Sequence, residues 1–395
     1  MNILFLAPEP FFQERGTPIA IKLALQVLSK RKGTKVKVIC YNEGTEENFE
    51  GVEIKRISKF PFTKGIRPGA SIKKIFLDII FFFSSINEVR KNKYDVIHAI
   101  EESVFIALFI KKLFKINYIY DMDSSLSEQL INRYKFLKIF RGVFVYFEKV
   151  AIKNAIAVLP MCDALANQAI NYGVEIVSVL RDIALNDLDD YKKDASNLRE
   201  ELNLPNTTKL LVYIGNLEHY QGIDLLIKSF ALARRCTEDL RLIIIGGAKE
   251  HIEKYQKLAK NFHVSEYVYL LGPKPVKTLG SLLSQADILA SPRIEGNNTS
   301  MKIYSYLLSG KPIVATNLPT HTQILNDSIC LLCEPTVQDF ALGIKELLEN
   351  PDFSNIIAEN AKKEAKEKYT FNVFSRTLND LYDKVDDKLL NKSKK

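Results

Sequence analysis

The sequence predicts an α/β protein with two doubly wound domains that face each other across a cleft. The chain has 395 residues, which is long for a single hydrophobic core. Short β-branched runs alternate with helix-length segments along it, a pattern typical of β-α-β units and parallel sheets. A polar stretch with few large apolar residues, 186–208, separates two halves of similar size and is the expected linker.

The expected strands occur in two series. The N-terminal domain, 1–185, has apolar runs at 2–7, 35–41, 95–100, 117–122 and 155–160. The C-terminal domain, 209–366, has them at 209–215, 240–246, 267–272, 287–291, 312–316 and 328–333. The last segment, 367–395, is predicted to be helical. In doubly wound sheets ligands bind beyond the carboxyl ends of the strands, so functional residues are expected in the loops that follow them.

Composition narrows the class of partner. The chain is 47% apolar and 26% charged, as in globular proteins, and its net charge of +8 suits an acidic small molecule or an anionic membrane surface. No nucleic-acid recognition motif is present. The start has no basic region of a signal peptide, and the scattered cysteines indicate a reducing compartment, so a cytoplasmic location is expected. The five histidines lack metal-ligand spacing, which predicts no metal site.

Three junctions between a strand and a helix have the features of a phosphate site. A helix start exposes unpaired N–H groups and the positive end of the helix dipole, which together attract anions. The first junction contains Gly16 and Thr17, and the second runs from Gly215 to Gln221. The third, "SPRIEGNNTSMK", places Thr299 or Ser300 as the N-cap and Lys302 in the first turn, where a cation opposes the dipole unless an anion binds. An ordinary capped helix is the alternative.

The order and character of these segments resemble a GT-B glycosyltransferase of the large retaining family 4. The resemblance covers essentially the whole chain and rests on "YIGNLEHYQGIDLLI", "LGPKPVKTL", "ADILASPR" and above all "KIYSYLLSGKPIVAT". It implies two Rossmann-like domains, with 367–395 returning to the N-terminal domain. It also implies a nucleotide-sugar donor on the C-terminal side, a glycan or lipid-linked acceptor on the N-terminal side, and neither metal nor cofactor.

Several charged positions of the family pattern are replaced here. Asn216 and Gln221 stand where the family has an Arg and a Lys that face the diphosphate, and Ser305 stands where it has the ribose-binding Glu. The other Glu of the family pair aligns with Asn297 by strict spacing and with Glu295 if the loop is two residues longer. A His of the N-terminal domain aligns with Asp123.

The residues and the resemblance together give the expected site. Catalytic roles are assigned to Asp123, Glu295 and Arg293, with the two carboxylates expected on opposite sides of the cleft. The acceptor side is assigned His98 and Glu101, a structural histidine being the alternative for His98. Donor contacts are expected from Gly16, Thr17, Gly215, Asn216, Gln221, Pro273, Val276, Asn297, Asn298, Thr299, Ser300, Met301, Lys302 and Ser305.

Two helical stripes suggest contact with a membrane. Residues 133–149 place Phe136, Phe140 and Phe147 on one face with basic residues around the other, and 72–86 has similar spacing. Such helices lie in the headgroup region of anionic bilayers, although most apolar stripes belong to a core. The expected location is therefore the cytoplasm or the cytoplasmic face of a membrane.

Two functions from different classes remain open. The first is a retaining, metal-independent transferase, because the cations Arg293 and Lys302 remain available for the leaving diphosphate. The second is a catalytically weakened GT-B subunit that binds nucleotide-sugar or partners an active transferase, because Asn216 and Gln221 replace two cations. A nicotinamide-dependent oxidoreductase is disfavoured, since no G-x-G-x-x-G is present.

Overall fold

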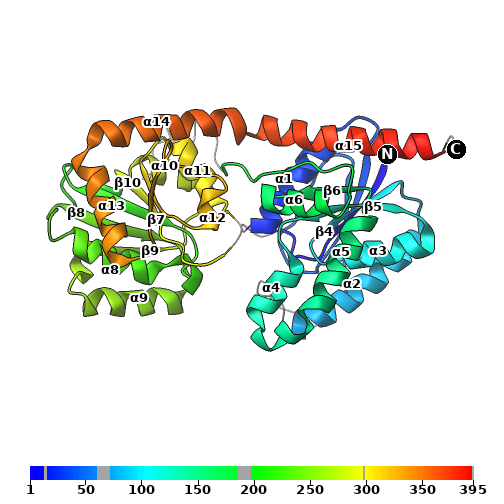
Figure 1. Ribbon diagram of the computed structural model, residues 1–395, viewed down its shortest axis with the longest axis horizontal. Coiled ribbons are helices and arrows are strands. Elements are labelled where there is room, and N and C mark those ends of the chain that lie inside the picture. Colours follow the sequence, from blue (N-terminus) through cyan, green and yellow to red (C-terminus); the bar gives the residue numbers. More distant parts are fainter. Residues whose placement is uncertain (13–15, 60–71, 186–196, 297–298, 394–395) are drawn as a thin grey trace. The chain divides into compact units, whose positions relative to one another are not determined.

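The computed structural model (Figure 1) describes residues 1–12, 16–59, 72–185, 197–296 and 299–393. The chain forms two compact units, of which unit 1 comprises Met1–Arg181 with Phe371–Lys395 and unit 2 comprises Asp182–Thr370. The first 11 residues of the expected linker, 186–196, lie outside the described residues. No helix in the described part of the chain is long and apolar enough to cross a membrane.

Unit 1 is built on a six-stranded parallel sheet with the order β3-β2-β1-β4-β5-β6. Its strands are β1 (Asn2–Ala7), β2 (Lys35–Cys40), β3 (Val52–Arg56), β4 (Val96–Ile100), β5 (Asn117–Met122) and β6 (Ala157–Pro160). Its helices are α1 (Gly16–Lys30), α2 (Ile72–Lys91), α3 (Ser103–Phe114), α4 (Leu126–Arg133), the 3₁₀ helix η2 (Lys135–Phe140), α5 (Arg141–Asn154), α6 (Asp163–Asn171) and α15 (Phe371–Ser393).

Unit 2 has a second six-stranded parallel sheet with the order β12-β11-β10-β7-β8-β9. Its strands are β7 (Lys209–Ile214), β8 (Leu240–Ile245), β9 (Val268–Gly272), β10 (Ile288–Ser291), β11 (Ile313–Thr316) and β12 (Leu331–Cys333). Its α-helices are α7 (Leu198–Glu201), α8 (Ile223–Ala233), α9 (Lys249–Asn261), α10 (Leu279–Ser284), α11 (Lys302–Ser309), α12 (Pro319–Thr322), α13 (Val337–Glu349) and α14 (Pro351–Lys368). Three short 3₁₀ helices complete it: η4 (His219–Gln221), η5 (Ser265–Tyr267) and η6 (Val276–Thr278).

The two sheets have the same topology, which confirms the predicted doubly wound fold. In each unit the first strand pairs with the second on one side and with the fourth on the other, so the winding reverses beside that first strand. Loops that leave the carboxyl ends of these two neighbouring strands form the ligand crevice of such sheets. In unit 2 they are the loops after β7 and β10, and in unit 1 those after β1 and β4.

All eleven predicted strands are present within a few residues of their expected bounds. Both sheets are covered by helices on their two faces, so central strands such as β4 and β10 are buried along their whole length. The strand that the prediction missed is β3, at the edge of sheet 1. Its sequence VEIKR alternates apolar and charged residues, and its side chains stay partly exposed. It therefore lacks the continuous apolar run of a buried parallel strand.

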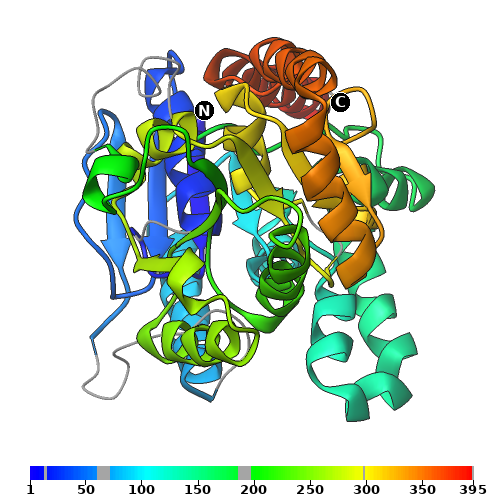
Figure 2. The same cartoon turned by 90° about the vertical axis from the view of Figure 1, so that its left-hand side faces the viewer.

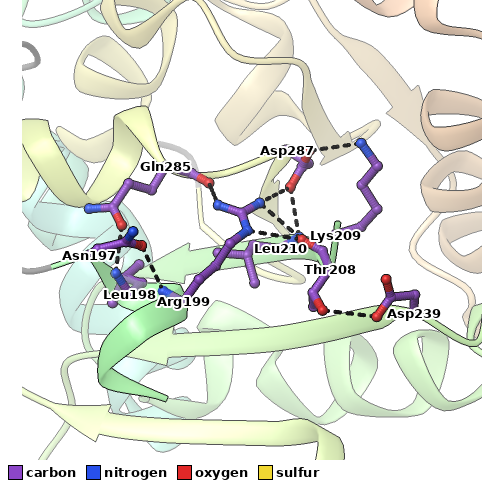
Figure 3. A network of polar contacts seen from close by, with 9 residues as sticks. All are labelled: Asn197, Leu198, Arg199, Thr208, Lys209, Leu210, Asp239, Gln285 and Asp287. Carbon is purple, nitrogen blue, oxygen red and sulfur yellow. Dashed lines mark hydrogen bonds and ion pairs between the residues drawn. The ribbon is translucent and has the colours of Figure 1, made fainter. Parts of the chain in front are cut away.

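A polar network fixes the start of unit 2 to the amino-terminal edge of its sheet (Figure 3). Arg199 on α7 donates through Nε and Nη2 to the Thr208 carbonyl at 3.1 and 2.9 Å, and its Nη2 lies 2.8 Å from Asp287 Oδ2. The same carboxylate oxygen accepts from the backbone N–H of Leu210 at 2.9 Å. This network lies at the opposite end of the strands from the loops after β7 and β10.

The last helix, α15, belongs to unit 1 and lies along α1 (Figure 1). Tyr382 on α15 is buried, and its hydroxyl lies 2.8 Å from His98 Nδ1 on β4. The other ring nitrogen, Nε2, lies 3.0 Å from Asp121 Oδ2 on β5. Arg31 adds ion pairs to Asp383 and Asp386. Polar contacts as well as apolar packing therefore attach the end of the chain to the first sheet.

Candidate functional site

The loops after β7 and β10 are held together at the crevice of unit 2. The backbone N–H of Ile294 donates to the Tyr220 carbonyl at 3.0 Å. Gly222 has φ +72°, and a Cβ there would lie 1.9 Å from the Pro292 carbonyl oxygen, so only glycine fits this approach. The two junctions that the sequence selected independently thus form one surface.

Lys302 is the central cation of this surface. Its Nζ donates to Gln221 Oε1 at 2.9 Å and lies 4.1 Å from the centre of the Tyr213 ring. Burial, together with the nearby charge of Arg293, holds the pKa of Lys302 well below its usual value. No carboxylate lies within ion-pair distance of Lys302 among the described residues. A desolvated ammonium without a counter-charge is costly, which suits a site that receives an anion.

Arg293 lies on the same surface, inside the turn that follows β10. Its Nε donates to the Glu295 carbonyl at 2.8 Å, and its guanidinium carbon lies 5.2 Å from the centre of the Tyr220 ring. Burial lowers the pKa of Arg293. Gly296 has φ +115°, and a Cβ there would lie 2.5 Å from Arg293 Nη2, so the backbone closes around the guanidinium. The Glu295 side chain itself is exposed.

The start of α11 differs from the expected capping. The helix begins at Lys302 with Met301 at the N-cap position, and no side chain caps it, so the expectation that Thr299 or Ser300 is the N-cap is wrong. Ser300 instead accepts at its carbonyl from the N–H of Ile303 at 2.9 Å. The Thr299 hydroxyl is buried and has no hydrogen-bond partner among the described residues. Asn297 and Asn298 lie outside the described residues.

Gly215 and Asn216 form the turn out of β7. A Cβ at Gly215 would lie 2.9 Å from Tyr213 Oη and 3.5 Å from Lys302 Nζ, so the loop passes close to the lysine. Tyr213 Oη donates to the Asn216 carbonyl at 2.6 Å. The Asn216 side chain accepts from the N–H of Glu218 at 3.2 Å and donates to Tyr220 Oη at 3.3 Å. The side chain of Asn216 thus stabilises the conformation of the loop after β7.

The remaining predicted donor residues of unit 2 lie in two other places. Ser305 is buried on α11, and its Oγ accepts from the backbone N–H of Leu185 at 3.1 Å. Pro273 is exposed in the loop after β9, and Val276 begins η6 in the same loop. Backbone groups of this loop remain the proposed contacts of the nucleotide base.

His321 is a residue of this region that the sequence reasoning missed. It is fully buried on α12, with Nε2 2.8 Å from Ser291 Oγ and Nδ1 2.9 Å from the Thr316 carbonyl. Because a carbonyl only accepts, Nδ1 carries the proton and Nε2 accepts from the serine. Burial, helped by the charges of Lys302 and Arg293 and opposed by the Thr316 hydrogen bond, lowers the pKa of His321 to about 4. His321 therefore stays neutral behind the two cations.

In unit 1, carboxylates gather at the carboxyl ends of β4 and β5. Glu101 is buried with φ +48°, and both of its carboxylate oxygens accept from Ser124 Oγ, at 3.2 and 3.0 Å. Burial raises the pKa of Glu101 well above its usual range, and the neighbouring charge of Asp123 raises it further. Ser125, not Asp123, caps α4, accepting from the N–H of Glu128 at 3.4 Å.

His98 lies beneath these carboxylates, inside the sheet. Its ring is fully buried, stacks on Phe5 with centroids 4.4 Å apart, and has both nitrogens engaged with Tyr382 and Asp121. This geometry favours the structural alternative for His98 over contact with an acceptor. Gly16 and Thr17 open α1 beyond the carboxyl end of β1, as expected. No group of three or more metal-ligating side chains occurs in the described ranges.

Comparison with known proteins finds a family match within unit 2. Residues 194–364, which carry most of the unit 2 sheet and its crevice, match the family described as glycosyl transferases group 1. The chain therefore carries a group 1 glycosyltransferase domain. A glycosyltransferase of Methanocaldococcus jannaschii, itself uncharacterized, is 24% identical over 76% of this chain and 74% of its own length. The alpha-1,3/1,6-mannosyltransferase ALG2 of Dictyostelium discoideum is 25% identical over 78% of each chain.

Solved structures agree on the fold of this glycosyltransferase. Sucrose-phosphate synthase from Thermosynechococcus elongatus has a TM-score of 0.77 at 16% identity, covering 97% of this chain and 98% of that one. HepE from Anabaena, solved in complex with UDP, has a TM-score of 0.76 at 17% identity, covering 97% and 100%. The predicted GT-B fold and glycosyltransferase class are thereby confirmed.

Proposed function

We propose that this protein transfers a sugar from a nucleoside diphosphate to a hydroxyl group of a glycan or lipid-linked acceptor, with retention and without a metal ion. The observation that carries the proposal is the un-neutralised Lys302 beside Arg293 at the crevice of unit 2. In the reaction the bond between the anomeric carbon and the diphosphate oxygen breaks, and the diphosphate leaves with the electron pair. The acceptor oxygen bonds to the anomeric carbon, and its proton passes to the departing diphosphate.

Lys302 and Arg293 supply the positive charge that the leaving diphosphate requires. Charge develops on the diphosphate as the bond breaks, and preorganised positive groups in a desolvated site stabilise it. Lys302, Arg293 and the unpartnered Thr299 hydroxyl are the proposed contacts, together with the N–H groups at the start of α11. These groups would neutralise the charge on the leaving diphosphate, as a divalent metal ion does in metal-dependent enzymes. Glu295 is proposed to meet hydroxyls of the donor sugar.

Unit 1 is the proposed acceptor side. Asp123 is the group proposed to receive or orient the acceptor hydroxyl. It lies next to Glu101, whose pKa is raised. A carboxylate whose pKa is strongly raised by burial and by a second carboxylate is typical of functional sites. The complexes of HepE with UDP and with UDP-glucose support a nucleotide-sugar donor for this fold.

The same unit presents a surface that suits an anionic membrane. Exposed apolar side chains on three contacting elements form what we call the α3–α5 face: Phe105, Phe109, Leu113, Phe136, Ile139, Phe140, Val143, Tyr146 and Phe147. The elements α4 and α5 lie side by side (Figure 2). Among the described side chains of α3, η2 and α5, every exposed charge is basic, because the acidic Glu148 is buried. Basic amphipathic surfaces of this kind bind anionic headgroups.

A second function is favoured by one observation. Asn216 and Gln221 are neutral, and Gln221 binds Lys302 rather than adding a charge of its own. A subunit that binds nucleotide-sugar without transferring it would tolerate this loss. A thermal-shift screen of nucleoside diphosphates and their sugars identifies the ligand, since binding to the folded state raises its stability. Slow hydrolysis of the stabilising donor without acceptor then supports the transferase, whereas stabilisation without any turnover supports the binding subunit.

A further inference from the structure

A groove of about 480 Å³ lies in unit 1 between α2 and α3, apart from the carboxylates of Glu101 and Asp123. Its volume is in the range of small-molecule sites, which are mostly apolar with a few placed polar groups. It is lined by Pro8, Ile75, Asp78, Ile79, Phe82, Phe83, Glu102, Ser103 and Ile106. Six of these nine side chains are hydrocarbon or aromatic, so the groove favours an apolar occupant.

The carboxylate of Asp78 and the rings of Phe82 and Phe83 lie in different turns of α2. Asp78 belongs to the second turn of the helix, whereas Phe82 and Phe83 follow one turn later, about 6 to 7 Å further along its axis. Glu102 approaches the early turns from the end of β4, through its ion pair with Lys74. The groove therefore has an acidic part and a hydrocarbon part, the arrangement that an amphiphile requires.

The hydrocarbon part continues onto exposed apolar surface. Ile75, Ile79 and Phe83 form one exposed stripe along α2, at a spacing of four residues. The rings of Phe82 on α2 and Phe109 on α3 have centroids 5.3 Å apart, so the groove adjoins the α3–α5 face. A chain that leaves the groove on this side would meet the surface proposed to contact a membrane.

The acidic part excludes an anionic head group. Among the described residues, the carboxylates of Asp78 and Glu102 line the groove, and the ammonium of Lys74 pairs with Glu102 and lies 3.6 Å from Glu9. The two lining carboxylates disfavour a phosphate beside them, whereas carboxylate oxygens accept hydrogen bonds from hydroxyl groups. Asp78 also accepts from Tyr41 Oη, and burial raises its pKa to about 6.

We propose that the α2–α3 groove binds the hydrocarbon chain of a glycolipid acceptor, with its uncharged hydroxyl-bearing head against Asp78 and Glu102. This inference rests on the proposed transfer function and narrows its acceptor to an amphiphile whose head next to the chain is uncharged. A lipid-linked acceptor with phosphate at that position does not fit.

The chain contains no tryptophan, which allows a site-specific fluorescence test. Ile79→Trp places a reporter in the groove, and Phe140→Trp places one on the α3–α5 face; the replaced side chains are 52% and 53% exposed. Dodecyl maltoside is added to the full chain below its micelle concentration. We expect a saturable blue shift of emission in Ile79→Trp and none in Phe140→Trp. Adding Phe83→Gln to the Ile79→Trp variant should weaken the response about tenfold or more.

Dodecyl phosphate is the matched anionic probe and should bind the Ile79→Trp variant at least about tenfold more weakly. Three results would each overturn the inference. They are equal responses of Ile79→Trp and Phe140→Trp, tighter binding of dodecyl phosphate than of dodecyl maltoside, and emission of Ile79→Trp that is already blue-shifted without amphiphile. Nucleoside diphosphate binding, measured by calorimetry in the same variants, separates the two proposals. If nucleotide binds but dodecyl maltoside does not, only the groove assignment fails; if wild type binds no nucleotide, the transfer function fails instead.

Discussion

Lys302 Nζ donates a hydrogen bond of 2.9 Å to Gln221 Oε1, joining the helix after β10 to the loop after β7. The uncharged side chain of Gln221 thereby fixes the position of Lys302, the cation at the start of α11. Because its side chain is uncharged, Gln221 orients Lys302 without repelling it. This relationship makes Lys302 the first residue to test.

Lys302→Ala should weaken binding of the nucleoside diphosphate by about tenfold or more, because a charge-assisted hydrogen bond contributes roughly 1.5–3 kcal/mol. Isothermal calorimetry measures the affinity. Lys209→Ala is the control, since Lys209 pairs with Asp287 at the other edge of the same sheet and should leave the affinity unchanged. Unchanged affinity in Lys302→Ala would remove this lysine from the donor site.

Binding should also take up a proton at pH values near and above the lowered pKa of Lys302. The pKa of Lys302 is lowered in the unliganded protein, and a bound anion favours the charged ammonium, so the ligand raises this pKa again. Affinity is therefore expected to fall as pH rises through the lowered pKa. Calorimetry in two buffers with different ionisation enthalpies reports the proton uptake, which Lys302→Ala should abolish.

Asp123→Asn should reduce transfer by orders of magnitude while the protein remains folded. Ser125 caps α4, so the amide does not disturb the helix, whereas a carboxylate that assists the reaction cannot be replaced by an amide. Steady-state turnover and the melting temperature are compared with wild type. Ser125→Ala is the control that should cost about 1 kcal/mol of stability with little loss of turnover per folded molecule. Full activity in Asp123→Asn would make Asp123 structural.

The double variant Phe140→Ser, Phe147→Ser should bind anionic liposomes more weakly and keep its melting temperature. Both rings are more than half exposed, so the core alternative for this stripe is wrong and little packing is lost. Liposome sedimentation at two salt concentrations measures the interaction, which should also weaken with salt. Leu342→Ser, an equally exposed apolar position on α13 of unit 2, provides the comparison. Equal losses in both variants would contradict a specific membrane face.

His321 should make unit 2 sensitive to acid. Its pKa is about 4 in the folded protein against 6.5 in the unfolded chain, so the unfolded chain binds more protons between these values. The stabilisation is complete above pH 6.5 and is lost as pH falls towards about 4, amounting to about 3 kcal/mol. Urea unfolding near pH 7 and near pH 4 measures the change in the free energy of unfolding, and His321→Gln should reduce this change. An identical pH dependence in the variant would show that another group titrates.

The sequence predicted most of the sheets because buried parallel strands are continuous apolar runs, as in β4 and β8. It missed β3, whose alternating charges suit an edge. It identified Lys302 and Gln221 separately, but the hydrogen bond between them depends on how two loops pack. The sequence did not indicate a role for His321, because "LPTHTQ" is typical of an ordinary polar turn. Its role follows from its burial beside Ser291 and Thr316. Capping at Thr299 or Ser300 failed because Met301 occupies the N-cap position instead.

The placement of α15 has a consequence for how the protein is made. A ribosome produces unit 2, residues Asp182–Thr370, after most of unit 1 but before Phe371–Lys395. Tyr382, the partner of His98, is therefore synthesised only after every residue of unit 2. Domains generally fold as units during synthesis. The second domain can thus complete its fold on the nascent chain, whereas the first domain keeps His98 without this partner until α15 has been synthesised.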